Sequence, residues 1–331
     1  MSTGIDQDRT TQTLEELLSS ELGEPVRVDR VQRRPSEFAT LSAAEVLSVL
    51  LGDGRELRLF LKHLGPEQSD QPDKQRRDRE VRVYEDLLRG NSGLPVPRYF
   101  GARWNAATHR HELYLQHVDD WNLRYHGLTH WFTAAARLAD LHGHFARDGR
   151  KLLECDFLLR LDETYFQAWA ERAVAAIRAL ESSLGQRLGR IAGEYGSAAR
   201  LLATQPPTLV HNDLAPKNVI AARDGATAQI FIVDWEMAGV GCGLLDLVHL
   251  KFGLDPLNEE RMVSAYCNQL HSAGLLPTDE QEFSRLLAAC ELHKTLYRLA
   301  HCPKWQLPLH RISGWVDEAE EFLRAARGTR P

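Results

Sequence analysis

The chain has 331 residues, of which 43% are hydrophobic and 26% are charged, and its formal net charge is −6. This length and composition are typical of a globular protein with one large or two modest domains, and the mildly acidic balance argues against a nucleic-acid-binding surface. The five cysteines form no C-x-x-C pair, which favours reduced thiols, and no apolar run has the length of a signal core or a membrane span. We therefore expect a cytoplasmic protein, monomer or homodimer, with neither nucleic acid nor membrane as a partner.

The first third of the chain predicts a short helix followed by a small antiparallel sheet. The helix covers 13–22, where Leu14, Leu17 and Leu18 share one face. Asp53-Gly54 is a strong hairpin signal between two of the strands. The expected strands run through 26–31, 45–51, 56–63, 99–100 and 112–118, and a second helix covers 78–89.

After residue 118 the pattern changes to helical spacing. The expected helices cover 131–145, 162–180, 184–202, 258–270, 278–300 and 313–327. The sequence therefore predicts an α+β fold. We expect an N-terminal lobe over 1–118, with the antiparallel sheet and one key helix, and a mostly helical C-terminal lobe over 119–331.

The stretch 209–246 carries the densest set of polar residues with a chemical meaning. His211, Asp213 and Asn218 read H-x-D-x-x-x-x-N, and Asp234 follows the β-branched run Ile230–Val233. A positioned carboxylate that accepts a hydroxyl proton, together with oxygen ligands for a metal on the phosphates, is what phosphoryl transfer needs. Asp213 is the candidate base, and Asn218 and Asp234 are the candidate magnesium ligands.

This pattern resembles the catalytic core of the protein-kinase-like fold, and more narrowly the aminoglycoside phosphotransferase and choline kinase family. Ala215 stands where protein kinases usually carry a lysine. Asp234-Trp235-Glu236 replaces their D-F-G, and Asp246-Leu247 follows too soon for a long activation segment. The resemblance implies a bilobal, protein-kinase-like fold in a small-molecule kinase that uses ATP or GTP with Mg²⁺.

Nucleotide binding is expected in the first lobe. Lys62 ends a predicted strand, and its ammonium can bind phosphates as a point charge. Glu80 lies on the inward face of the helix over 78–89, where its carboxylate can hold the Lys62 ammonium in place. The turn from Arg34 to Ala39 contains no glycine, so the resemblance suggests that Ser36 and main-chain amides contact the phosphates. The hinge residues expected to contact adenine through main-chain atoms are Gln116, His117 and Val118.

The resemblance implies that two stretches line the acceptor pocket, 156–169 and 291–297. Two kinds of acceptor are compatible with them. Acidic side chains would face a polyamine-like antibiotic, whereas aromatic and hydroxyl-bearing side chains would line a site for a neutral sugar or macrolide, the outcome that the sequence favours slightly. The candidate substrate residues are Asp162, Glu163, Tyr165, Trp169, Glu236 and Glu291.

The function that the sequence predicts is an ATP-dependent phosphotransferase with an alcohol group as acceptor. Its leading use is antibiotic resistance, by phosphorylation of an antibiotic-like or sugar substrate. A metabolic kinase for a sugar, an amino alcohol or a choline-type acceptor is the alternative. A non-catalytic nucleotide-binding scaffold of the same fold is the rival from another class, and it would be marked by loss of Lys62, Asp213, Asn218 or Asp234, all of which are present.

Overall fold

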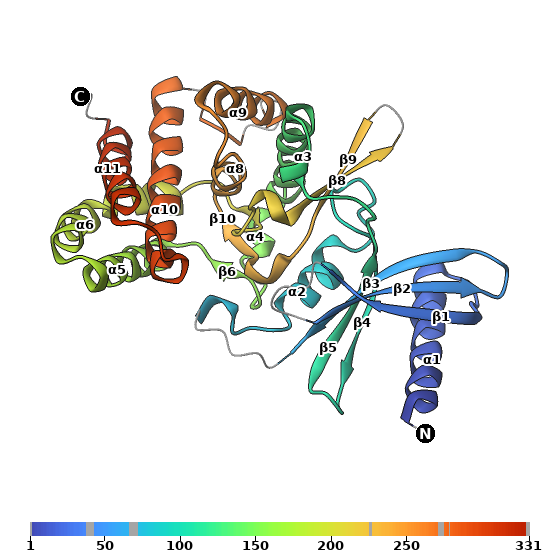
Figure 1. Ribbon diagram of the computed structural model, residues 1–331. Helices are drawn as coiled ribbons and strands as arrows, with labels where there is room; N and C mark the ends of the chain where they lie inside the picture. The colour runs from blue at the N-terminus through green and yellow to red at the C-terminus, as the bar shows by residue number, and fades with distance from the viewer. Residues whose placement is uncertain are drawn as a thin grey trace. The chain divides into compact units, whose positions relative to one another are not determined.

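A computed structural model describes residues 2–37, 43–65, 72–224, 227–270, 275–277 and 279–328. The chain forms two compact units, Met1–Tyr125 with Val219–Met237, and His126–Asn218 with Ala238–Pro331. The α+β fold class predicted from the sequence is confirmed, since the first unit holds an antiparallel sheet and the second is mostly helical (Figure 1). The functional lobe boundary at 118 stays a prediction.

The sheet of the first unit has the strand order β1-β2-β3-β5-β4, with every neighbouring pair antiparallel. The predicted hairpin at Asp53-Gly54 joins β2 to β3, and Gly54 takes a positive φ of 88° there, a conformation that glycine adopts without strain. The strands are β1 (Val28–Pro35), β2 (Ala44–Leu51), β3 (Glu56–Leu64), β4 (Tyr99–Asn105) and β5 (Arg110–Gln116).

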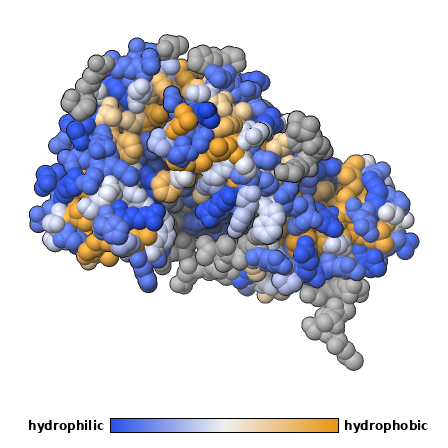
Figure 2. Space-filling model, turned by 45° about the horizontal axis from the view of Figure 1, so that its top comes forward, coloured by the Kyte–Doolittle hydropathy of each residue, from blue (hydrophilic) through white to orange (hydrophobic). Residues whose placement is uncertain are grey.

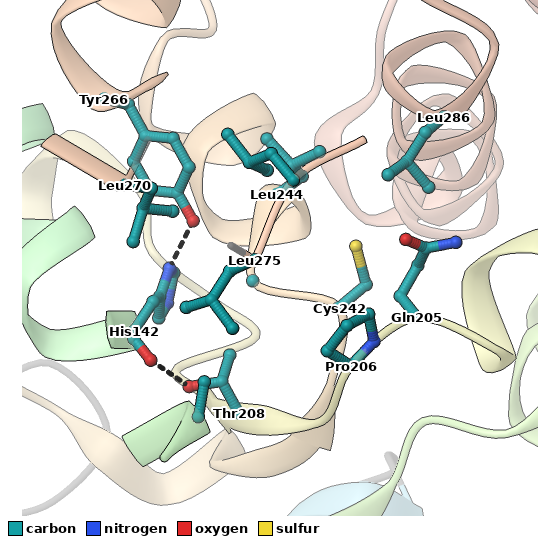
Figure 3. Close-up of a pocket in the computed structure, with 13 residues that line it drawn as sticks. His142, Gln205, Pro206, Thr208, Cys242, Leu244, Tyr266, Leu270, Leu275 and Leu286 are labelled. Carbon is teal, nitrogen blue, oxygen red and sulfur yellow. Dashed lines mark hydrogen bonds between the residues drawn. The ribbon is translucent and has the colours of Figure 1, made fainter. Parts of the chain in front are cut away.

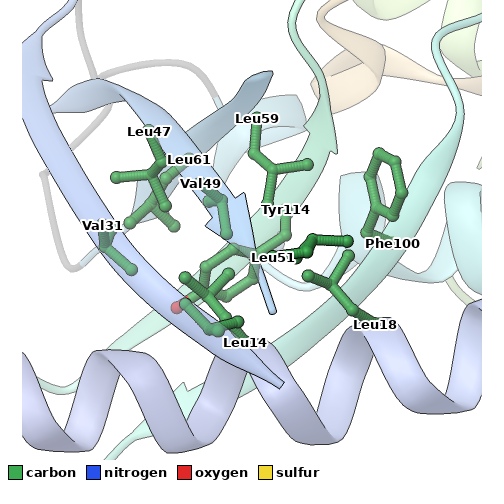
Figure 4. Packing of buried hydrophobic residues seen from close by; sticks show 11 residues of the cluster. Leu14, Leu18, Val31, Leu47, Val49, Leu51, Leu59, Leu61, Phe100 and Tyr114 are labelled. Carbon is green, nitrogen blue, oxygen red and sulfur yellow. The ribbon is translucent and has the colours of Figure 1, made fainter. Parts of the chain in front are cut away.

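Helix α1 (Ser2–Leu22) packs on one face of this sheet (Figure 4). Leu14 and Leu18, one turn apart, are 1% and 0% exposed and contact inward side chains of the strands, among them Leu47 and Leu61. The helix is longer than the predicted 13–22 because its first turns are polar and carry no apolar stripe to signal a helix.

The opposite face of the sheet receives the helix that carries Glu80. Because successive strand side chains point to opposite faces, Lys62 lies on the face away from Leu61 and α1. The helix begins as α2 (Arg79–Arg82) and continues as the wider π-helical turn η2 (Val83–Leu88), where Tyr84 stacks on Tyr99 at a centroid distance of 6.2 Å. The remaining elements of this unit are η1 (Pro72–Lys74), η3 (Leu123–Tyr125), the hairpin β8 (Val219–Asp224) and β9 (Thr227–Ile232), and η5 (Trp235–Met237).

The second unit is built around α10, which packs against α5 and α11 (Figure 1). Its small sheet has the order β6-β10-β7 and leads into the loop that carries Asp213. The helices are α3 (Leu128–Ala146), α4 (Gly149–Leu152), α5 (Glu163–Leu180), α6 (Ser182–Glu194), α7 (Gly196–Ala203), α8 (Leu244–Leu250), α9 (Pro256–Leu270), α10 (Glu280–Trp305) and α11 (Leu309–Ala326). The short elements are β6 (Leu159–Arg160), β7 (Thr208–Val210), η4 (Pro216–Asn218) and β10 (Gly239–Gly241).

One predicted helix is wrong in its continuity. The stretch 184–202 divides between α6 and α7 at Tyr195, which is fully buried and whose hydroxyl lies 3.2 Å from His293 Nδ1 on α10. Gly193 and Gly196 flank the break, and glycine lowers the cost of leaving the helical path. Three predicted positions, Phe38 and Ala39 of the phosphate turn and Thr278 at a helix start, lie outside the described residues.

The surface in view in Figure 2 is largely hydrophilic, with separate apolar patches. The exposed large apolar side chains are Trp104, Trp121, Tyr125, Leu128, Leu153, Leu180, Phe252, Leu257, Trp305 and Leu309. Among the described helices, none combines the length and the apolar character that a membrane crossing requires.

Candidate active site

The first unit places Lys62 between two carboxylates. Its Nζ lies 2.6 Å from Glu80 Oε2 and 2.6 Å from Asp234 Oδ1. The Lys62 and Glu80 side chains are 14% and 2% exposed, while that of Asp234 is 31% exposed. The ion pair expected between Lys62 and Glu80 therefore forms, and Asp234 joins it from the end of the β8–β9 hairpin.

The charges of this cluster are strongly coupled. Burial alone would lower the pKa of Lys62, but Asp234 and Glu80 outweigh it, so the pKa lies above its usual value and the ammonium stays charged. Burial raises the pKa of Glu80 to about 7, against the opposing effect of Lys62. One ammonium thus faces two carboxylates, and the more exposed of the two, Asp234, is the one that a cation from solvent can reach.

The segment after Asp234 is held by basic side chains of the same unit. Lys74 forms an ion pair with the Glu236 carboxylate, and the buried Arg79 donates from Nη1 to the Glu236 carbonyl oxygen at 2.6 Å. Asp234 itself has a φ of 70°, a left-handed conformation that is strained for a residue with a side chain. These contacts explain how the strained turn is maintained, while the substrate contact expected of Glu236 stays a prediction.

The predicted hinge and phosphate turn are partly engaged in the sheet. The N–H of Gln116 donates to Arg98 O at 2.8 Å, and that of His117 donates to Arg58 O at 3.1 Å. An adenine contact from this stretch would therefore use its carbonyl groups or the N–H of Val118. Ser36 follows β1, and its N–H donates to Ala44 O at 2.8 Å.

The second unit holds the loop with the predicted base. Asn218 Nδ2 donates to the carbonyl oxygen of Asp213 at 2.8 Å, and the Asp213 N–H lies 3.3 Å from His211 Nδ1. The Asp213 side chain is 16% exposed. His211 therefore braces the loop through its ring, while the carboxylate of Asp213 keeps contact with solvent.

A buried carboxylate on α8 fixes the backbone of this loop. Asp246 is fully buried and accepts hydrogen bonds from the N–H of His211 at 2.7 Å and of Asn212 at 2.8 Å. His142 Nε2 lies 3.3 Å from the same carboxylate. Burial would raise the pKa of Asp246, but hydrogen bonding and charge from His142 and its neighbours hold it below the usual value. A carboxylate that stays ionised in the interior is thus matched to two main-chain donors.

His142 lines a small pocket, where hydrogen bonds orient it (Figure 3). Its Nδ1 lies 2.7 Å from the Tyr266 hydroxyl, and its carbonyl oxygen accepts from the Thr208 hydroxyl at 2.8 Å. Leucine side chains of α8, α9 and α10 close the remaining wall of this pocket. The network that runs from Tyr266 through His142 to Asp246 therefore supports the loop from its buried side.

A second histidine lies close to the predicted base. His249 Nε2 is 3.9 Å from Asp213 Oδ1. Burial, and then the positive charge of Lys294, lower the pKa of His249 well below its usual value. The imidazole is therefore neutral at physiological pH, and it does not pair electrostatically with the base.

The three acids expected to bind a cationic acceptor have other partners. Asp162 caps α5, with Oδ1 accepting from the Tyr165 N–H at 2.9 Å. Glu163 lies 3.4 Å from Arg200 on the surface, and Glu291 lies 2.5 Å from the buried Lys251. Each of these carboxylates thus has a partner within the second unit, although Glu291 shares Lys251 with Glu259.

The aromatic candidates occupy a buried layer between α5 and α10. Trp169 is 2% exposed, with Tyr297 at a centroid distance of 4.5 Å and His301 stacked at 5.3 Å. The Tyr165 hydroxyl accepts a hydrogen bond from Asn212 Nδ2 at 2.7 Å. Lys294 of the other predicted stretch donates to Asn212 O at 3.0 Å, so both stretches reach the residue that precedes Asp213.

Comparison with known proteins identifies the family of this chain. Residues 39–280 match the sequence signature of the APH group, described as the phosphotransferase enzyme family. The chain belongs to this family. The family suspected from the sequence is thereby confirmed, and the protein is a phosphotransferase that acts on hydroxyl acceptors. No curated protein matches the chain.

Solved structures share the fold of this phosphotransferase at low identity. Choline kinase from Cryptosporidium parvum Iowa II is 12% identical, with a TM-score of 0.59 over 91% of this chain and 92% of that chain. The GDP complex of wild-type aminoglycoside 2'-phosphotransferase-IIIa is 13% identical, with a TM-score of 0.57 over 96% and 98%. Macrolide 2'-phosphotransferase MphH from Brachybacterium faecium is 16% identical, with a TM-score of 0.53 over 96% and 99%.

The residues expected to hold magnesium fit that role in their chemistry. Asn218 uses its Nδ2 for the loop, so its amide oxygen is the group that can serve a metal, and the Asp234 carboxylate is partly exposed. Both are the hard oxygen ligands that Mg²⁺ prefers. Within the described ranges, no three His, Cys, Asp or Glu side chains gather to hold a metal ion.

Sequence reasoning overlooked several residues that hold the predicted site residues within each unit. Asp246 was used only as part of the family's sequence pattern, although its carboxylate accepts two main-chain hydrogen bonds from the loop. Asn212, between the two named residues of the motif, and Lys294 on α10 were given no such role, and neither were Lys74 and Arg79. Their partners come from distant parts of the chain, so only the polar residue between His211 and Asp213 offered a signal.

Proposed function

We propose that the phosphotransferase moves the γ-phosphate of ATP or GTP to a hydroxyl group of a neutral, ring-bearing small molecule, with Asp213 as the base. The observation that carries this proposal is the construction of the loop. Asp246 and Asn218 hold its backbone through three hydrogen bonds, while the Asp213 carboxylate stays in contact with solvent. A fixed backbone with an accessible carboxylate is what orienting an acceptor hydroxyl requires.

The nucleotide is assigned to the cluster in the first unit. Lys62, kept charged and held in place by Glu80, would neutralise phosphate oxygens. Its second carboxylate partner, Asp234, would serve the magnesium ion together with Asn218. When bound, magnesium supplies positive charge that stabilises the phosphates and the leaving group. In this proposal Ser36 and the hinge stretch 116–118 complete the nucleotide site.

The neutral character of the acceptor is inferred from charge. Asp162, Glu163 and Glu291 are engaged in a helix cap and two ion pairs. A desolvated ammonium group needs a paired carboxylate, which these acids do not offer without losing their present partners. Lys294 adds positive charge beside the loop. A polycationic aminoglycoside or a choline-type amine is therefore disfavoured relative to a sugar-like or macrolide-like acceptor.

The biological use follows from the acceptor class. Resistance by phosphorylation of a hydroxylated antibiotic is the leading candidate, and the macrolide 2'-phosphotransferase among the similar structures supports it. Phosphorylation of a metabolic sugar is the second candidate, since both acceptors present ring hydroxyl groups without requiring acidic partners. Either use fits an enzyme that works where ATP is available, in the cytoplasm.

The test is a screen of acceptors with the purified full-length enzyme, ATP or GTP, and magnesium. Nucleoside diphosphate release would be followed with macrolides, sugars, aminoglycosides and amino alcohols, and each product would be identified by mass spectrometry. We expect turnover with a neutral ring-bearing acceptor, and none after Asp213→Asn. Asp148→Asn is the matched control because Asp148 is exposed and pairs only with the nearby Lys151.

Two results would contradict the proposal. Turnover confined to aminoglycosides or amino alcohols would show that the acids give up their present partners for a cationic acceptor. Nucleotide binding without turnover on any class would favour the non-catalytic scaffold.

A further inference from the structure

Three helices of the second unit converge on Asn212. Its N–H donates to Asp246 of α8 at 2.8 Å, its side-chain Nδ2 donates to the Tyr165 hydroxyl of α5 at 2.7 Å, and its carbonyl oxygen accepts from Lys294 Nζ of α10 at 3.0 Å. Asn212 is fully buried. The N–H, the carbonyl oxygen and the side-chain Nδ2 of Asn212 thus each have a partner on a different helix, immediately before Asp213 in the chain.

The backbone at Asn212 needs such anchors. Its φ is 66°, a left-handed conformation that asparagine tolerates better than most residues but that is still less favourable than the ordinary regions. Strain of this kind persists only where the surroundings over-determine it, and it is concentrated at functional sites. The direction in which the Asp213 side chain leaves the loop depends on this peptide geometry.

A lysine is an unusual donor for the buried hydrogen bond to the carbonyl oxygen of Asn212. Lys294 is 3% exposed, and no carboxylate of the described residues forms an ion pair with it; beyond Asn212 O, its Nζ lies 5.3 Å from the Tyr297 ring centroid. Burial lowers the pKa of Lys294, although the negative charges of Asp246 and Asp213 oppose that effect. A buried ammonium without a carboxylate partner is expensive, so a merely structural site would be better filled by an apolar side chain.

We propose that Lys294 is a positioning residue for the transfer step: its ammonium holds the carbonyl of Asn212 and thereby fixes the backbone from which Asp213 projects. Lys294 and Tyr165 then act on the base through the same residue. The proposal rests on the assignment of Asp213 as the base. It implies that α5 and α10, the helices of the expected acceptor pocket, also set the geometry of catalysis.

The test combines kinetics with hydrogen exchange on the full-length enzyme. Lys294→Met keeps the length of the side chain but removes the charge and the donor. We expect kcat to fall on the order of 10²-fold, with nucleotide Kd and acceptor KM changing by no more than about threefold, because misplacement of a base affects the transfer step. Lys294→Arg retains the charge and the donors, so its kcat should be about tenfold higher than that of Lys294→Met. In the Met variant the amides of His211 and Asn212 should exchange faster than in the wild type.

Tyr165→Phe provides the second arm. If both side chains act through Asn212, the double variant with Lys294→Met should lose less activity than the product of the two single losses. Arg298→Met is the matched control: Arg298 lies one turn further along α10, donates to Thr295 Oγ1 at 2.7 Å and packs over Phe252. It should lower stability while leaving kcat within about twofold.

Each of three outcomes would overturn the proposal. One is a kcat of Lys294→Met within about threefold of wild type, and another is an equal loss of kcat in the Lys294 and Arg298 variants. The third is unchanged amide hydrogen exchange at His211 and Asn212 in Lys294→Met. If the Met variant does not fold, Lys294→Gln takes its place with the same thresholds. Absence of wild-type turnover on every acceptor would contradict the proposed function, and the exchange measurement, which needs no acceptor, would still decide the role of Lys294.

Discussion

Replacement of Asp246 by Asn tests how strongly the α8 carboxylate holds the catalytic loop. The wild-type carboxylate accepts two main-chain hydrogen bonds at 2.7 and 2.8 Å in a fully buried position. An asparagine of the same shape has one oxygen for two donors, and its NH₂ group would face the other N–H. The change therefore removes one charge-assisted bond and leaves a buried donor without an acceptor.

The magnitude follows from these two losses. A hydrogen bond to a charged group contributes about 1.5–3 kcal/mol, and an unsatisfied buried donor costs about 1–3 kcal/mol, so we expect a destabilisation of roughly 3–5 kcal/mol. For a unit of this size, that corresponds to a drop in Tm on the order of 10 °C. Because the Asn212 peptide is released, kcat should also fall by about 10²-fold.

The assay is thermal unfolding together with steady-state kinetics at neutral pH. The pKa of Asp246 is depressed in the folded state, so its contribution to stability is present above the unfolded pKa of about 3.9 and is lost only as pH falls through the folded pKa. Neutral pH thus reports the full effect. Asp148→Asn, on the surface, should change Tm by less than about 2 °C. An Asp246→Asn enzyme with wild-type Tm and kcat would refute the reasoning.

Three further predictions concern the other residues of the site. Asp213→Asn should lower kcat by about three orders of magnitude with nucleotide Kd within a few fold, measured by turnover and calorimetry; near-normal turnover would contradict the assignment of the base. Asp234→Ala should weaken magnesium-dependent nucleotide binding more than Asn218→Ala, since a carboxylate brings charge to the cation and an amide does not; calorimetry with and without magnesium checks this, and equal affinities throughout would count against it. For Glu80, whose folded pKa of about 7 lies above its unfolded value, the stability contribution is present at acidic pH and is lost as pH rises through about 7. The wild-type Tm should therefore fall relative to the Tm of Glu80→Gln as the pH rises from about 5 to about 8. A difference in Tm that stays constant over this range would show that Glu80 does not titrate there.

The sequence predicted those features that depend on local pattern. Strand alternation and helical spacing placed Lys62 and Glu80 on facing surfaces, and the two side chains meet at 2.6 Å. The hairpin at Asp53-Gly54 and the leucine face of α1 follow from equally local rules. The α+β class came from the same patterns, because strand alternation prevails before residue 118 and helical spacing after it.

What the sequence did not predict depends on distant partners or on a backbone angle. Lys294 and Tyr165 reach Asn212 from 82 and 47 residues away along the chain. Asparagine tolerates a positive φ better than most residues, but its presence alone does not predict one. The pocket role predicted for the acids at 162 and 291 stays a prediction, but their present partners were not foreseen, although Asp162 stands where a helix cap is expected. For Glu291, the partner Lys251 lies on a different element, and no spacing rule joins them.

The discontinuous build of the first unit has a consequence for how the protein can be made and divided. Its last piece, Val219–Met237, is separated from the rest by one of the two segments of the second unit, His126–Asn218, and Asp234 meets Lys62 across 172 residues of sequence. During synthesis the sheet emerges from the ribosome long before this piece. A fragment that ends at residue 125 therefore carries Lys62 with Glu80 but lacks the β8–β9 hairpin. A gene split at that point yields a first fragment that requires the hairpin carried by the second fragment, so complementation of separately produced fragments would report the contact between Lys62 and Asp234.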